Sequence, residues 1–391
     1  MKINIRHLAA ALLLATFSLQ PSALMAQGSL TPPGAPAETM KTLDQIEART
    51  PISSAPFPIS NPGSYYLTAN LTVSGGDAIT ITANGVTLDL RGFTIASTAP
   101  SATGYGVRVN SGLSDITIYN GHIRGGVTNN GSGVYSGSGF GYGIYAYPTR
   151  NARVSGVSVS GCLNSGIYLS TWDSTVVESC TVRTVGGFGI IAATIKASVA
   201  KDCGLDAING NLTIDCWGES SGSSSGLTTN MAQNCYGSSN TGTGLYAANT
   251  ALNCHGSSSS GSYGLYAVTI AQNCYGYNNN GHGIYSATVL NCHGTSTSSY
   301  GLYAINAQNC YGSSSSGTGL FANIAQNCFG YTNGAGTGLQ TDVGFNCFGH
   351  SATGTGLGFA RVGAMCWGER TSPAATNYVL GSGMAGSVNL P

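Results

Sequence analysis

Between about residue 58 and residue 370, apolar and polar positions alternate in short runs. Residues 65–67, 71–73 and 86–90 are typical, with many β-branched or aromatic side chains, and Gly, Asn and Ser separate the runs. A two-residue period of this kind predicts half-buried β-strands. No amphipathic pattern of helical length separates the runs, so the connections between strands are expected to be bends rather than crossover helices.

One tetrapeptide, Asn-Cys-aromatic-Gly, recurs seven times in the second half of this region. Its copies begin at Asn234, Asn253, Asn273, Asn291, Asn309, Asn327 and Asn346. Between copies lies a Gly-aliphatic pair, from Gly244-Leu245 to Gly356-Leu357, and from Cys216 onward successive cysteines are 18 to 20 residues apart. This repeat, over residues 216–368, predicts stacked coils, and about 310 residues at ~20 per coil predict roughly 15 of them.

Residues at the same point of successive coils form columns along the stack. The Asn column is expected at a tight bend, because Asn tolerates the left-handed backbone conformation and its amide can bond the next Asn. Asp202 and Asp215 are expected to hold the same place in earlier coils. The Gly of the tetrapeptide is expected at a tight corner.

The Cys column points inward if the aromatic residue after each Cys points outward. Three interpretations of twelve cysteines follow. They form a buried column of free thiols, or disulfides between neighbouring coils, which an oxidising compartment and the strand spacing both permit, or a metal site. A linear column does not place four thiolates tetrahedrally, which disfavours the metal site, so no metal is expected.

Two aromatic columns follow from the same repeat. The first is Trp217, Tyr236, His255, Tyr275, His293, Tyr311, Phe329, Phe348 and Trp367, and the second is Tyr246, Tyr266, Tyr285, Tyr303 and Phe321. If the rings point outward, they either stack on one another to stabilise a sheet surface or form a binding platform for sugar rings or a partner.

The chain resembles bacterial secreted right-handed parallel β-helix proteins. Residues 59–67 and 85–95 look like the opening coils of that family, and Gly143-Ile144-Tyr145 and Gly166-Ile167-Tyr168 continue the likeness over roughly residues 58–370. The resemblance implies an all-β, right-handed parallel β-helix. It does not imply one activity, because the superfamily includes polysaccharide lyases, glycoside hydrolases and adhesins.

Both ends of the chain leave the repeat. Residues 1–26 combine a basic start, a short apolar run and a small residue, as in a signal peptide. Residues 27–57 contain a Pro-rich linker and an amphipathic helix over residues 37–49, which is expected either to cap the first coil or to mediate self-association. Residues 371–391 are expected to cap the last coil.

Composition limits the classes of binding partner and the cellular compartment that are expected for this chain. Charged residues make up 7% of the chain and the net charge is zero, so nucleic acid is excluded as a partner. No later segment supplies ~20 consecutive apolar residues, so no transmembrane segment is expected. We expect an exported protein, whether extracellular, cell-surface or periplasmic, with no cofactor, and a neutral surface that suits polysaccharide or a surface partner.

An active site is harder to assemble from the sequence. The acids and one lysine that cluster are Asp173, Glu178, Lys201, Asp202, Asp206 and Glu219. Only 13 residues separate Cys203 from Cys216, which predicts an irregular coil there, and such coils often carry function. The sequence therefore favours a non-catalytic rod for surface or extracellular interaction. The alternative is a polysaccharide lyase or glycoside hydrolase, with carboxylates near Asp173–Glu219.

Overall fold

The computed structural model describes residues 47–372 and 376–380. Internal contacts divide the chain after Ala48, and the following description concerns the unit that begins at Arg49. The predicted signal peptide, nearly all of the predicted helix over residues 37–49 and most of the predicted C-terminal cap lie outside the described residues.

The described residues contain strands and no helix. The first strands are β1 (Thr50–Ile52), β2 (Phe57–Ile59), β3 (Gly63–Leu67), β4 (Leu71–Val73), β5 (Ile79–Ile81), β6 (Val86–Asp89), β7 (Thr94–Ser97), β8 (Tyr105–Val109), β9 (Ser114–Arg124), β10 (Gly126–Asn129), β11 (Tyr135–Ser138), β12 (Tyr142–Ala146), β13 (Arg150–Cys162), β14 (Ile167–Leu169), β15 (Val176–Glu178), β16 (Thr181–Val185), β17 (Ile190–Lys196) and β18 (Val199–Cys203). The later strands are β19 (Ile208–Ile214), β20 (Trp217–Ser220), β21 (Leu227–Gln233), β22 (Tyr236–Ser239), β23 (Leu245–Leu252), β24 (His255–Ser258), β25 (Tyr263–Gln272), β26 (Tyr275–Asn278), β27 (His282–Leu290), β28 (His293–Ser296), β29 (Leu302–Gln308), β30 (Tyr311–Ser314), β31 (Leu320–Gln326), β32 (Phe329–Thr332), β33 (Thr337–Phe345), β34 (Phe348–Ser351), β35 (Thr355–Ala364), β36 (Trp367–Arg370) and β37 (Thr376–Leu380).

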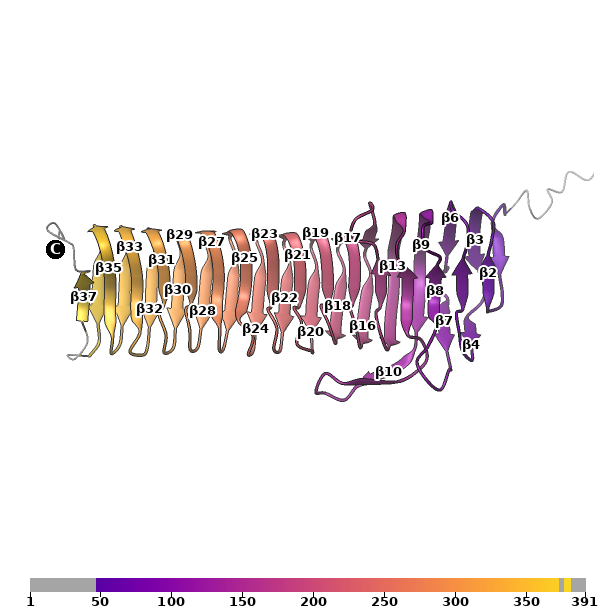
Figure 1. Cartoon of the computed structure of the whole chain (residues 1–391), viewed down its shortest axis with the longest axis horizontal. Helices are drawn as coiled ribbons and strands as arrows, with labels where there is room; N and C mark the ends of the chain where they lie inside the picture. Colours follow the sequence, from indigo (N-terminus) through magenta and orange to yellow (C-terminus); the bar gives the residue numbers. More distant parts are fainter. Residues whose placement is uncertain (1–46, 373–375, 381–391) are drawn as a thin grey trace, which may run out of the picture. The chain divides into compact units, whose positions relative to one another are not determined.

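Apart from β10 and β11, these strands form a solenoid of about 17 turns, in which strands pair in parallel with the equivalent strands of neighbouring turns (Figure 1). From β17 onward each turn consists of one short and one long strand. β24 pairs with β22 and β26, and β25 pairs with β23 and β27. The all-parallel coil predicted from the repeat is thus confirmed, with about two turns more than expected, because the pairing begins at Thr50 and extends to Leu380.

The interior is built from columns of identical or similar side chains. Leu245, Leu265 and Ile284 are fully buried and paired in register. Ala, Ser and Cys columns fill the rest of each turn, and the Cys column is buried as predicted, with exposed fractions of 3–6% from Cys347 to Cys366. Each coil buries only one layer of side chains, so a continuous hydrophobic core forms only when the coils stack on one another.

Two glycines in each turn bring the backbones of the short and long strands into direct contact. A Cβ on Gly256 would lie 2.3 Å from the carbonyl oxygen of Gly264, and a Cβ on Gly264 would lie 2.4 Å from the carbonyl oxygen of Tyr277 in the next turn. No side chain fits between these backbones. The prediction that the tetrapeptide Gly forms a corner is therefore wrong, because Gly256 lies inside a strand and faces the interior.

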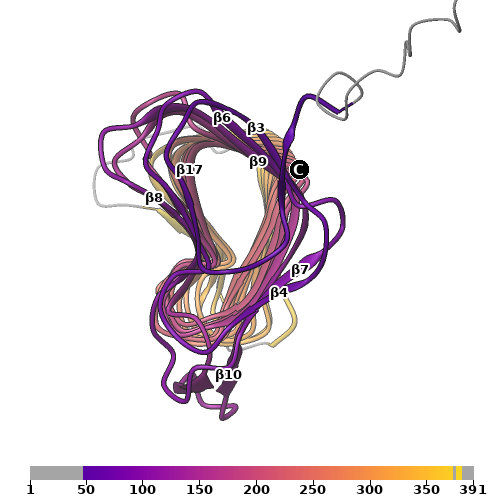
Figure 2. The same ribbon diagram turned by 90° about the vertical axis from the view of Figure 1, so that its right-hand side faces the viewer.

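One hairpin interrupts the coil. β10 and β11 pair antiparallel, and they lie outside the ring of stacked turns when the solenoid is viewed along its axis (Figure 2). The hairpin returns to the solenoid near Gly204 and Ser221, because a Cβ on Gly204 would meet the Tyr135 ring and a Cβ on Gly133 would meet the Ser221 carbonyl.

Cys203 and Cys216 lie in different columns of the solenoid. Cys203 does not belong to the column of Cys216, because it pairs in register with Val185 and Ser220. The place before Cys216 in its own column is held by Ser198, and Cys180 lies one turn earlier, at regular intervals of 18 residues. The short Cys203–Cys216 spacing therefore measures the distance between two columns. The coil there is nevertheless irregular, because the pairing of β18 with β20 shifts in register between Ala200 and Cys203.

Candidate functional site

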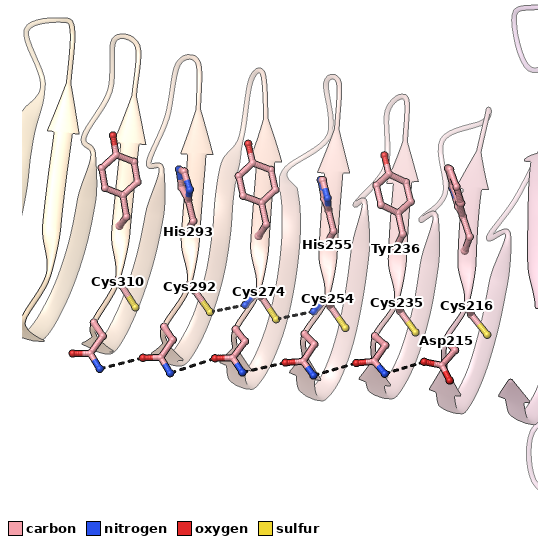
Figure 3. A pocket seen from close by; sticks show the side chains of 18 of the residues that line it. Asp215, Cys216, Cys235, Tyr236, Cys254, His255, Cys274, Cys292, His293 and Cys310 are labelled. Atoms are coloured by element: carbon pink, nitrogen blue, oxygen red, sulfur yellow. Dashed lines mark hydrogen bonds between the residues drawn. The ribbon is translucent and has the colours of Figure 1, made fainter. Parts of the chain in front are cut away.

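The Asn column forms a continuous ladder at the bend between the long and short strands. Its seven Asn residues have φ between 50° and 53°. The side-chain amide of each donates to the side-chain oxygen of the residue one turn earlier, at 3.0–3.3 Å between the two atoms, and Asn234 donates to Asp215 at 2.9 Å (Figure 3). Both parts of the prediction for this column, the left-handed backbone and the amide ladder, are confirmed.

The Cys column lies beside the Asn ladder. All twelve cysteines have free thiols, so of the three interpretations the structure contains the buried thiol column. The thiol of Cys235 donates to the carbonyl of Gln233 at 3.1 Å, and that of Cys274 donates to Gln272 at 3.2 Å. Burial raises the pKa of Cys162 to about 12 and that of Cys180 to about 11.

The first aromatic column lies on the outer side of the same strands. Trp217 and Trp367 are 41% and 47% exposed, and most rings between them are half-buried. Ring centroids from Trp217 to Phe348 follow one another at 4.5–5.1 Å. The rings are therefore in contact along the column, edge-to-face from Trp217 to Tyr311 and stacked from Tyr311 to Phe348, and their partial exposure leaves them accessible from outside.

A groove runs between the Asn ladder and the ring column (Figure 3). Its volume is about 1140 Å³, it extends from Val199 to Asn327, and the Cys column forms its floor. Asp215, at one end, is its only carboxylate. Burial lowers the pKa of His255 and that of His293, which favours the neutral form of both rings.

The second aromatic column lies on the long strands. Tyr246, Tyr266 and Tyr285 contact one another at 5.1–5.2 Å, and Tyr303 and Phe321 continue the stack. A similar cluster, not predicted from the sequence, lies near the other end, where Tyr105, Tyr142, Tyr145 and Tyr168 are in contact. Repetition of the Gly-Ile-Tyr motif was the signal that could have identified it.

The candidate catalytic residues occupy different sides of the coil. Asp173, in the bend between β14 and β15, lies 3.8 Å from Arg150, and Glu178, at the end of β15, lies 3.2 Å from Arg153. Asp206 is largely buried, which raises its pKa, and it accepts hydrogen bonds from Asn209 and Ser225.

Lys201 and Glu219 lie on the short strands, close to the ring column. The Nζ atom of Lys201 is 3.4 Å from the centroid of the Trp217 ring and 4.0 Å from Glu219. The lysine thus covers the first ring of the aromatic column, where a cation over a Trp face is favourable.

Asp202 anchors the hairpin. Its carboxylate accepts hydrogen bonds from Asn129 at 2.6 Å and Tyr135 at 2.8 Å, both on the hairpin, and from Thr184 and Ser221 on neighbouring turns. Asp202 is therefore not in the Asn column as expected, although its φ of 54° is also left-handed. Burial alone would raise the pKa of Asp202, but the four hydrogen bonds together lower it.

This anchor should be pH-dependent. Because the folded pKa of Asp202 lies below its ordinary value of 3.8, its stabilising contribution is present above that value and is lost as the pH falls through the folded pKa. In Asp202→Asn we expect faster hydrogen exchange in residues 126–138 than in the wild type at about pH 6, and a difference that shrinks as the pH falls through the lowered pKa of Asp202. A difference that persists undiminished in acid would contradict this role. Asn tolerates the left-handed backbone, so the substitution removes the charge and one acceptor oxygen without requiring a change of backbone conformation.

The described residues contain no group of three or more His, Cys, Asp or Glu side chains arranged to hold a metal ion. Within the same ranges no helix is long and apolar enough to cross a membrane.

Comparison with known proteins agrees with the fold. Residues 60–225 match the family described as "Right handed beta helix region". No curated protein sequence matches the chain. Among solved structures, the chain is similar to the A-module of a mannuronan C-5 epimerase from Azotobacter vinelandii, with 15% identity and a TM-score of 0.24 over 82% of this chain and 87% of that chain. The family match over residues 60–225 and the parallel, stacked turns agree on a right-handed β-helix fold.

Proposed function

We propose that this protein is an exported, non-catalytic β-helix that binds an uncharged polysaccharide along the groove between the Asn ladder and the first aromatic column. The observation that carries the proposal is the groove itself, which repeats the same aromatic and amide groups over successive turns. A periodic groove suits a periodic ligand, because each turn offers the same contacts to each repeat of the ligand chain.

The rings alternate in orientation along the groove. Tyr236, His255 and Tyr275 are inclined to one another by 63° and 74°, and His293 is inclined to Tyr275 by 81°. In Figure 3 Tyr236 shows its ring face, whereas His255 and His293 are seen nearly edge-on. Tyrosines thus recur at every second turn, roughly 10 Å apart. That interval is comparable with the spacing of alternate sugar rings in an extended β-linked glycan, whose C–H faces can stack on aromatic rings.

The opposite wall can hydrogen-bond to hydroxyl groups. Each ladder Asn uses one N–H and one oxygen lone pair within the ladder, which leaves a second N–H and a second lone pair. Asn253, Asn273 and Asn291 are exposed, so these groups recur once per turn beside the rings. Apolar surface with regularly placed polar groups is typical of ligand sites.

Charge favours a neutral ligand over an acidic one. Asp215 carries the negative charge of the groove, and burial favours the neutral form of the histidines. A uronic-acid polymer would therefore find no cation to pair with its carboxylates along the lining, apart from Lys201 over the Trp217 ring at one end.

The carboxylates support a non-catalytic role. Asp173 and Glu178 pair with arginines, Asp202 anchors the hairpin, Asp206 is hydrogen-bonded in a buried position, and Glu219 lies beside Lys201. A glycosidase instead requires two carboxylates facing one scissile bond.

The test is binding to neutral and acidic polysaccharides by affinity electrophoresis and pull-down on insoluble glycans. We expect retention on a neutral β-linked glycan, and Tyr275→Ala should weaken it about tenfold. Tyr285→Ala is the matched control, because Tyr285 is also half-buried and ring-stacked but lies on the second column.

Two results would overturn the proposal. One is equal loss of binding in both variants. The other is release of reducing or unsaturated ends that stops in Glu219→Gln, which would instead support a polysaccharide-active enzyme.

A further inference from the structure

Nine cysteines occupy nine successive turns without interruption: Cys216, Cys235, Cys254, Cys274, Cys292, Cys310, Cys328, Cys347 and Cys366. We propose that this column binds soft, thiophilic metal ions, each held in a line between the thiolates of two successive turns, as is typical of Cu⁺, Ag⁺ and Hg²⁺. The proposal is independent of glycan binding.

The spacing of the column fits two-coordinate binding. The thiols project along the axis toward the preceding turn, since the N–H of Cys254 donates to Sγ of Cys274 at 3.4 Å and the N–H of Cys274 donates to Sγ of Cys292 at 3.2 Å (Figure 3). Equivalent sulfur atoms therefore repeat with the strand spacing of ~4.8 Å. An ion midway between two of them would lie ~2.4 Å from each, close to the ~2.3 Å of ordinary metal–thiolate bonds.

The same geometry excludes ions that need more ligands. The described residues offer no group of three or more His, Cys, Asp or Glu side chains suited to a metal, so tetrahedral zinc and oxygen-bound calcium have no site. Thiolate sulfur selects soft ions. The column therefore suits ions that bind two sulfur ligands in linear coordination.

Ions can reach the column because the floor of the open groove includes Cys216 to Cys310. Binding breaks two S–H bonds and forms two metal–sulfur bonds, and the two protons leave to water in the groove without any change of oxidation state. With Hg²⁺ the resulting bis-thiolate is uncharged, which avoids the cost of burying a net charge. Hg²⁺ is therefore the probe of choice.

The column contains its own evidence that serine is tolerated. Ser198 holds the place between Cys180 and Cys216, where its hydroxyl donates to the carbonyl of Lys196 at 2.7 Å and accepts from the N–H of Cys180. Column cysteines make the same contact with the carbonyl two residues earlier. Cys→Ser substitutions should therefore leave the fold intact.

The experiment compares two variants that lose the same number of thiols. Replacing Cys235, Cys274, Cys310 and Cys347 with Ser leaves five column thiols and no adjacent pair. Replacing Cys310, Cys328, Cys347 and Cys366 with Ser leaves the five adjacent thiols Cys216 to Cys292. Reduced full-length proteins are loaded with Hg²⁺, washed with a monothiol that strips singly bound ions, and analysed for bound metal and by X-ray absorption.

At two thiols per ion, nine adjacent thiols hold up to four ions and five hold up to two. We expect about four ions in the wild type, about two in the contiguous variant and none in the alternating variant, with two sulfur neighbours per ion. Equal loading of the two variants would overturn the proposal, as would three or four sulfur neighbours in the wild type. The latter measurement needs no variant and remains decisive if a variant fails to fold.

Discussion

Replacing Gly264 with Ala is expected to lower the free energy of unfolding by about 3 kcal/mol or more, the upper range for overpacking a core. The added Cβ would lie 2.4 Å from the carbonyl oxygen of Tyr277 and 2.6 Å from its nitrogen. These are backbone atoms of the next turn and cannot rotate away. The two turns would have to separate, which would weaken the parallel hydrogen bonds on both sides of the contact.

The measurement is urea denaturation followed by circular dichroism, with Gly75→Ala as the control. Gly75 has no atom within 4 Å of its added Cβ and no left-handed φ, so its substitution should change stability by less than about 0.5 kcal/mol. Equal effects of the two substitutions would show that backbone contact is not what requires Gly264.

Asn273→Ala should cost about 2 kcal/mol, the second large effect. The φ of Asn273 is 53°, a conformation that costs a residue such as Ala ~1–2 kcal/mol. The substitution also removes the hydrogen bonds to Asn253 and Asn291, each worth ~0.5–1.5 kcal/mol net and less where the groups can return to water.

Asn273→Gly separates these two causes. Gly adopts the left-handed conformation without steric cost, so it should recover the part of the loss that arises from the backbone, while the ladder remains broken at this turn. The same denaturation experiment compares both variants with the wild type. If Gly is as destabilising as Ala, the ladder alone accounts for the effect. If Gly restores full stability, the amide hydrogen bonds contribute nothing.

Much of this protein could be predicted from the sequence because stacking converts a sequence period into spatial columns. Once Asn253 and Asn273 are one turn apart, their side chains must be neighbours, and the ladder, the buried thiols and the ring column follow from local geometry. The same reasoning predicted aromatic rings beside an amide wall. The sequence could not reveal that the space between the rings and the Asn ladder is an open groove, because that depends on the depth of the bend between the long and short strands.

Prediction failed where two columns contain the same residue type. Cys203 and Cys216 are both cysteines but lie in different columns, and only the register of the strand pairing distinguishes the two columns. Asp202 was misplaced for the same reason.

Contacts between residues far apart in the chain could be learned only from the tertiary structure. Asn129 and Tyr135 reach Asp202 from 73 and 67 residues away, through a hairpin that belongs to no repeat. By itself the sequence determined the coil and its columns, because each depends on residues one turn apart. The sequence left the direction of the aromatic columns open, and the structure decided it. The tertiary structure decided the glycine contact across the turn, the dispersal of the acids and the anchoring of the hairpin, because these depend on how strands pack against one another and not on the period that places them.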